Sequence, residues 1–67
     1  MNLNKLAGKV AESGKSKKEL AKAFGISVQA INKKLNGKTK ITTDDAQIFC
    51  KTLNIDDYKE KAEIFLQ

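Results

Sequence analysis

The chain has 67 residues, of which 40% are hydrophobic, so it can bury one small core and is unlikely to contain a large dry catalytic cleft. With no histidine and only Cys50, it cannot assemble a Cys/His zinc cluster or an intramolecular disulfide, and Cys50 is interpreted as a small apolar core residue. No apolar stretch approaches membrane-spanning length, so we expect a soluble cytoplasmic protein without membrane contact.

Positive charge is concentrated in the first part of the chain. Residues 1–41 hold ten lysines against two glutamates, a net charge of +8, whereas residues 42–67 have a net charge of −3. This asymmetry favours a polyanionic partner for the first part, the alternative being an ordinary solvated lysine surface. Every cation is lysine, so phosphates can be attracted, but the bidentate arginine contact with guanine is absent.

The first predicted element is an amphipathic helix that starts near Leu3. Its apolar residues follow the i, i+3, i+4, i+7, i+8 spacing and are Leu3, Leu6, Ala7, Val10 and Ala11. Gly14 can end the helix in the left-handed conformation. We expect this helix to be a scaffold element.

A second helix is predicted between Ser16 and Phe24. Ser16 and Glu19 have the spacing of a capping box, in which each side chain pairs with a free backbone N–H group. The buried side of this helix is expected to contain Leu20, Ala21 and Phe24.

A sharp turn at Gly25 is predicted to lead into a third helix over residues 28–36. Gly25 can adopt a positive φ, and Ser27 is the expected N-cap. Ile26 and Ile31 have the spacing of a hydrophobic staple, which fixes the angle at which the helix begins. The second and third helices are therefore predicted to cross at a fixed angle.

The third helix is predicted to turn Ile31 and Leu35 inward. Its polar residues are expected on the opposite side, namely Gln29, Asn32, Lys33 and Asn36. A basic loop over residues 37–42 follows.

A fourth helix is predicted after the N-cap region at Thr42. Its apolar positions have helical spacing and are Ala46, Phe49, Cys50 and Leu53, and Asn54 is the expected end. The tail is predicted to be partly helical, with Tyr58, Ala62 and Phe65 roughly in phase.

The sequence contains no pattern that favours catalysis. The pairs Asp44/Asp45 and Asp56/Asp57 lie at predicted helix starts, where they stabilise the helix dipole. Without histidine there is no nucleophile-base pair, and no glycine-rich phosphate loop is present. We therefore expect no enzyme activity, no cofactor and no metal site.

Residues 16–55 resemble the helix-turn-helix domain of phage repressors and Cro-type proteins. The segment "KKELAKAFGIS" is similar to the first motif helix and turn, and "VQAINKKLNGKTK" to the recognition helix and the loop after it. The resemblance implies an all-α, lambda-repressor-like fold, a compact bundle of about five short helices. We expect residues 1–67 to form a single domain of this kind that binds double-stranded operator DNA.

The same resemblance assigns roles to individual residues. The base-reading candidates are Gln29, Lys33, Asn32 and Val28, and the phosphate-binding candidates are Ser16, Lys17, Asn36, Lys38 and Lys40. The sequence departs from the family pattern at Lys34, where an apolar residue is usual, because the apolar residue here is Leu35. This departure predicts a rotated helix that moves Ala30 outward and Val28 toward the core, so Val28 is either a base contact or a partly buried valine.

Two functions are compatible with the sequence. The first is a phage or prophage transcriptional repressor of Cro type, and the alternative is an antirepressor that keeps the fold but binds a partner repressor protein. A homodimer is expected, either free or assembled only on DNA. Phe65 is predicted to pack on the bundle while Ile64 and Leu66 point elsewhere, so the expected interface residues are Tyr58, Ile64, Phe65 and Leu66.

Overall fold

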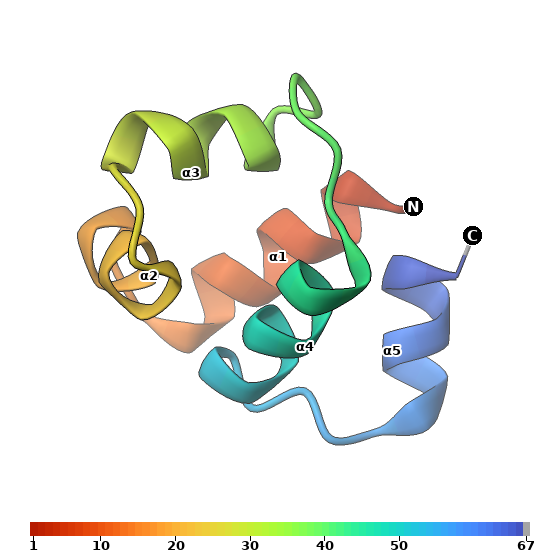
Figure 1. The fold of residues 1–67 in the computed structure, drawn as a ribbon. Helices are drawn as coiled ribbons and strands as arrows, with labels where there is room; N and C mark the ends of the chain where they lie inside the picture. Colours follow the sequence, from red (N-terminus) through yellow and green to blue (C-terminus); the bar gives the residue numbers. More distant parts are fainter. Residues whose placement is uncertain (67) are drawn as a thin grey trace.

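Five α-helices make up the computed structural model, which describes residues 1–66 (Figure 1). They are α1 (Leu3–Ser13), α2 (Lys17–Phe24), α3 (Val28–Leu35), α4 (Thr43–Thr52) and α5 (Tyr58–Phe65). No strand occurs in this range, which confirms the all-α prediction. Within the same range, no helix is long and apolar enough to cross a bilayer.

A polar side chain caps the start of every described helix. Each cap accepts a hydrogen bond of 3.1 Å from a backbone N–H group in the first turn, and the caps are Asn2, Ser16, Ser27, Thr42 and Asp57. At Ser16 the capping box is complete, because the Glu19 carboxylate accepts the N–H group of Ser16. A second complete box joins Thr42 and Asp45. Short-range hydrogen bonds therefore define where the helices begin.

The turn between α2 and α3 follows the expected left-handed pattern. Gly25 has a φ of 70°. The N–H group of Ile26 donates to the carbonyl of Ala21 at 3.0 Å, and that of Gly25 donates to the carbonyl of Lys22 at 3.1 Å. These two bonds form a Schellman motif, which satisfies carbonyl groups at the end of α2 and reverses the chain within a few residues. The expected cap at Ser27 then starts α3.

Similar turns end α3 and α4. Gly37 has a φ of 77°, and the N–H group of Lys38 donates to the carbonyl of Lys33 at 2.9 Å. After α4, the positive φ belongs to Asn54, at 57°, and Asn54 is the one non-glycine residue with a positive φ among the described residues. This places Asn54 directly after the C-cap residue Leu53, close to the predicted end of the helix.

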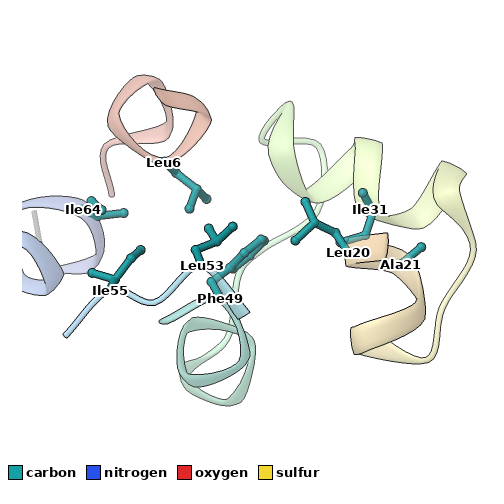
Figure 2. Packing of buried hydrophobic residues seen from close by; sticks show 8 residues of the cluster. All are labelled: Leu6, Leu20, Ala21, Ile31, Phe49, Leu53, Ile55 and Ile64. Carbon is teal, nitrogen blue, oxygen red and sulfur yellow. The ribbon is translucent and has the colours of Figure 1, made fainter. Parts of the chain in front are cut away.

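Phe49 lies at the centre of a single hydrophobic cluster (Figure 2). The buried members come from every helix and from the segment before α5, and are Leu6, Leu20, Ala21, Ile31, Phe49, Leu53, Ile55 and Ile64. The ring of Phe49 also packs edge-on against Phe24 at a centroid distance of 4.8 Å and stacks on Phe65 at 6.4 Å. Burial of these aromatic and aliphatic side chains supplies the main driving force for folding.

The structure corrects the predicted orientation of the tail. Ile64, expected to point away from the bundle, is fully buried, and its carbonyl accepts the N–H group of Asn2 at 2.8 Å. Phe65 packs on the core as predicted, whereas Tyr58 is 76% exposed and Leu66 is 73% exposed. The orientation of α5 follows from the burial of Ile64 in the same cluster as Leu6, which joins distant parts of the sequence (Figure 2).

Alanine substitution of the glycines is expected to separate backbone strain from steric conflict. A positive φ costs alanine about 1–2 kcal/mol, and at Gly25 the added Cβ atom meets nothing within 4 Å. At Gly37 the Cβ atom would lie 2.8 Å from Leu3 Cδ1, the end of a partly buried side chain that would have to shift, so Gly37→Ala should destabilise the protein slightly more than Gly25→Ala. Urea unfolding of both variants measures the difference.

Gly8→Ala is the matched control for this pair. Gly8 lies inside α1 with open space around its Cα atom, so the added methyl group should stabilise the protein by about 0.5–1 kcal/mol. Equal losses of stability in the Gly25→Ala and Gly37→Ala variants, or a loss of stability in Gly8→Ala, would contradict this account.

Candidate nucleic-acid interface

One face of α3 is anchored in the core. Ile31 is fully buried, and Leu35, one turn later, packs against the buried cluster. Ile26, the residue before the Ser27 cap, packs on the same cluster. Helix α2 packs against both α3 and α4, so α3 is held along its inner side and at its first turn.

The opposite face of α3 is open and polar. Gln29, Lys33 and Asn36 are exposed and follow one another at i, i+4 and i+7. Residues at this spacing are neighbours on a helix surface, so the three side chains form one stripe. The structure thus brings the two main predicted base-reading residues together on the uncovered side of the helix.

The other two base-reading candidates occupy the edges of this stripe. Val28 is 40% exposed, so the predicted movement of Val28 toward the core is wrong. Ala30, expected to move outward, is partly buried. Asn32 is also partly buried. Its Oδ1 atom is inaccessible to solvent and has no hydrogen-bond partner among the described residues.

The basic loop is folded against the end of α3. The N–H groups of Lys38 and Thr39 both donate to the carbonyl of Lys33, at 2.9 Å and 3.3 Å. Lys38 and Lys40 are exposed, and Asn36 at the C-cap position of α3 is exposed beside them. Two lysines are therefore presented next to the Asn36 end of the polar stripe.

Comparison with known proteins identifies this arrangement. A family model described as helix-turn-helix, the Cro/repressor type, matches residues 9–57, which include α2, α3 and α4. The chain belongs to this helix-turn-helix family. Neither the curated proteins nor the solved structures that were compared gave a match. Members of the family are DNA-binding transcription regulators and are typically not enzymes.

Within the helix-turn-helix, two of the free backbone N–H groups at the N-terminus of α2 are already hydrogen-bonded to side chains of the protein. The Ser16 hydroxyl accepts the N–H group of Glu19, and the Glu19 carboxylate accepts the N–H group of Ser16. The Ser16 hydroxyl still has its own proton to donate, and Lys17 is exposed beside it. A phosphate at this end of α2 can therefore be bound by Ser16 and Lys17, but it also meets the negative charge of Glu19.

Lys34 joins the recognition helix to α4. Its Nζ atom lies 2.8 Å from Asp45 Oδ2, and the two side chains are only 18% and 14% exposed. Burial alone would raise the pKa of Asp45, but hydrogen bonds from Lys34 and from the Thr42 backbone hold it below its usual value. A lysine thus occupies a position where an apolar residue was expected, and its partner on α4 balances its charge.

Other lysines of the basic segment are also paired with carboxylates. Lys5 contacts Glu63, and Lys9 contacts both Glu60 and Glu12. The hydrogen bond to Glu60 raises the pKa of Lys9, and the hydrogen bond from Lys5 lowers the pKa of Glu63.

Seven of the ten lysines in residues 1–41 make no ion pair with a described residue. They are Lys15, Lys17, Lys18, Lys22, Lys33, Lys38 and Lys40. All seven lie in the segment from α2 to the loop after α3 or just before it. The unpaired positive charge is therefore concentrated around the helix-turn-helix, a distinction that net charge alone did not reveal.

The Lys34–Asp45 pair predicts a specific pH dependence of stability. The pKa of Asp45 is lower in the folded protein than in the unfolded chain. Its ionised carboxylate therefore contributes its full stabilisation above the unfolded-state pKa of about 3.9, and this stabilisation is lost as the pH falls through the folded-state pKa. Asp45→Asn should destabilise the protein by about 1 kcal/mol at pH 7. This difference from the unsubstituted protein should shrink below pH 4, as measured by urea unfolding.

Asp44→Asn is the control for this experiment. Asp44 is the neighbouring carboxylate in the first turn of α4, is exposed and has no ion pair among the described residues. It should change stability much less than Asp45→Asn. A pH-independent effect of Asp45→Asn would rule out the ionic contribution.

Proposed function

We propose that the chain is a phage or prophage type transcription regulator that represses genes by occupying operator DNA. Membership of the family supports DNA binding and transcription regulation. The observation that carries the proposal is the uncovered polar stripe on α3, formed by Gln29, Lys33 and Asn36 on a helix anchored by Ile31. Occupation of a promoter by such a domain would block transcription without any catalytic step.

The dimensions and chemistry of α3 suit the major groove. The groove is about 12 Å wide and admits one α-helix, whose outer side chains then meet the base edges. Gln29 can pair with N6 and N7 of adenine, and Lys33 can donate to O6 or N7 of guanine. Val28, at the exposed start of α3, can contact a thymine methyl group. The side chain of Asn32 would have to rotate before its buried Oδ1 atom could accept a hydrogen bond from a base.

Flanking groups are proposed to hold the backbone of the DNA. Ser16 and Lys17 are placed at the start of α2, and Asn36, Lys38 and Lys40 at the end of α3 and in the loop. Contacts on both sides of a recognition helix fix its register without reading sequence. This division of roles makes base-reading and positioning residues separable by mutation.

We also propose that the regulator acts as a homodimer, free or on DNA. Two recognition helices about one DNA turn apart, roughly 34–36 Å, read twice as many base pairs as one helix. In the predicted tail interface, Leu66 and Tyr58 are exposed, Phe65 is partly buried and Ile64 belongs to the core. Any tail contact must therefore use residues other than Ile64.

An antirepressor that binds a partner repressor is the second candidate. The absence of arginine and the exposed Tyr58 and Leu66 in the acidic C-terminal part favour it. Because such a protein would not need DNA, direct DNA binding separates the two functions.

DNA binding should weaken steeply with salt. About four lysine–phosphate contacts per subunit give an expected slope of log K against log salt of roughly −3 to −4 per monomer. Fluorescence anisotropy with a labelled duplex from beside the gene would measure it. No binding at low salt, or affinity independent of salt, would favour the antirepressor instead.

Substitutions in α3 and in the loop should have different consequences. Gln29→Ala or Lys33→Ala should cost about 1–3 kcal/mol on the specific site and much less on random DNA. Lys38→Ala should weaken both kinds of binding about equally. Competition titrations of a specific duplex against random DNA give the ratio that separates these effects.

Lys59→Ala is a control for the loss of one positive charge. Lys59 is exposed in the first turn of α5, a helix that Figure 1 shows on the other side of the bundle from α3, so its substitution should leave both affinities nearly unchanged. If the Gln29, Lys33 and Lys38 variants all lower specific and random binding in the same proportion, α3 does not read the sequence.

A further inference from the structure

The Lys34–Asp45 pair joins the recognition helix to the start of α4. Among the described residues, it is the one ion pair or side-chain hydrogen bond that links α3 to another helix. Asp45 is itself fixed, because its Oδ2 atom also accepts the Thr42 N–H group at 3.1 Å and the Thr42 hydroxyl accepts the Asp45 N–H group. Lys34 is therefore bound to a carboxylate that the first turn of α4 holds in place.

Lys34 lies to one side of the residues that anchor α3 in the core. Successive residues of an α-helix are turned by about 100°, so Lys34 is turned by about 100° from Leu35 and by about 60° from Ile31. These two apolar anchors hold α3 against the core. Because apolar burial has no preferred direction, it leaves the helix some freedom to turn about its own axis. A hydrogen-bonded ion pair beside the anchors can remove that freedom.

The apolar pattern of α3 by itself favours a different rotation. The spacing of its apolar residues predicts that Val28 turns inward and Ala30 outward. In the structure Val28 is 40% exposed and Ala30 is partly buried. The Lys34 side chain is only 18% exposed and lines a hollow together with Leu3 and Ile41. Helix α3 thus keeps a charged residue beside apolar side chains while its valine faces solvent.

We propose that the Lys34–Asp45 pair holds α3 in this rotation and thereby decides which bases its outer side chains reach. Lys34 and Asp45 are then positioning residues, which act through Gln29 and Lys33 rather than by contact with a base. The effect on sequence reading rests on the proposed function, whereas the effect on the rotation of α3 does not.

Loss of the pair should turn α3 in a defined direction. An ammonium group that loses its carboxylate partner is unfavourable in a partly buried position. Without Asp45, the Lys34 ammonium moves toward solvent and α3 turns with it. Ala30, four residues earlier on the same side of the helix, moves outward. Val28, on the other side of Ile31, moves inward.

A small rotation is enough to disturb base reading. An α-helix with its side chains is about 10–12 Å across, so a turn of about 20° moves the outer ends of the side chains by about 2 Å. Hydrogen bonds to base edges need donor–acceptor distances of about 2.7–3.2 Å. Such a displacement breaks or changes the contacts of Gln29 and Lys33 although both residues are still present. Attraction to phosphates depends on charge and is affected less.

Asp45→Asn and Asp44→Asn form a matched pair for testing the proposal. Both remove one negative charge from the first turn of α4, but among the described residues only Asp45 pairs with Lys34. Relaxation enhancement of methyl groups by a neutral gadolinium chelate measures their exposure in each full chain without DNA. In Asp45→Asn we expect the enhancement to fall at Val28 and to rise at Ala30. In Asp44→Asn we expect no change at either methyl group.

The double variant Lys34→Met/Asp45→Asn separates the ion pair from other effects of Asp45. Its net charge equals that of the unsubstituted protein. Methionine needs no charged partner beside the apolar side chains of the hollow, and exchange of a buried pair for apolar groups is often neutral for stability. We expect Val28 and Ala30 to regain their original exposure. If Asp45 acted only as a cap of α4, the second substitution would not restore it.

Sequence preference is measured on duplexes that the unsubstituted full chain selects from a randomised pool. The ratio of affinities for a selected and a random duplex should fall at least about fivefold in Asp45→Asn, the loss expected for one base contact. It should change less than twofold in Asp44→Asn and in the double variant. Urea unfolding checks that each variant is folded. Asp45→Ser, whose hydroxyl also caps a helix, replaces Asp45→Asn if that variant does not fold.

The outcomes distinguish this proposal from the proposed function. Unchanged exposure of Val28 and Ala30 in Asp45→Asn overturns the proposal, whether or not the chain binds DNA. A double variant that stays turned also overturns it, as does a turned α3 with an unchanged affinity ratio. If α3 turns as expected but the unsubstituted chain selects no duplex, the orienting role of the pair is supported and DNA binding is contradicted.

Discussion

The fixed crossing of α2 and α3 is the constraint on which the interface depends. The Schellman turn at Gly25 ends α2, the Ser27 cap starts α3, and Ile31 is buried in the shared core. If any of these were lost, the polar stripe could still exist on a helix, but its direction relative to α2 would not be defined. A base-reading helix needs such definition, because hydrogen bonds to base edges tolerate only small errors in distance and angle.

Ion pairing gives the basic segment a sharper functional pattern than its composition indicates. Ion pairs of Lys5 and Lys9 connect α1 to α5, and the ion pair of Lys34 connects α3 to α4. Their carboxylate partners come mostly from the acidic C-terminal part of the chain. The charge asymmetry of the sequence therefore has two consequences: it attaches the last helix to the first, and it leaves the unpaired lysines around the helix-turn-helix.

The features predicted correctly from the sequence depend on residues close together in the chain. Ser16 pairs with Glu19 three positions later, and Gly25 and Ser27 end one helix and begin the next within two positions, so these patterns are visible without a structure. The orientation of α5 could not be predicted in this way, because it depends on Ile64 and on the pair of Lys5 with Glu63, 58 positions apart. Likewise, the residue pattern of α3 suggested a rotation that would bury Val28, but the Lys34–Asp45 pair lets a lysine occupy a partly buried position while Val28 stays 40% exposed.

The small size of the core also explains why one side of α3 stays uncovered. A chain of 67 residues buries only eight side chains in the described cluster, and the outer face of α3 cannot be covered if it is to meet DNA. Helices α1 and α2 contact α3 on its inner side, and some apolar side chains near the ends of the described chain, such as Leu66, remain exposed. Gln29 and Lys33 therefore stay exposed on the face of α3 that the small core does not cover, which is the face that a base-reading helix has to present.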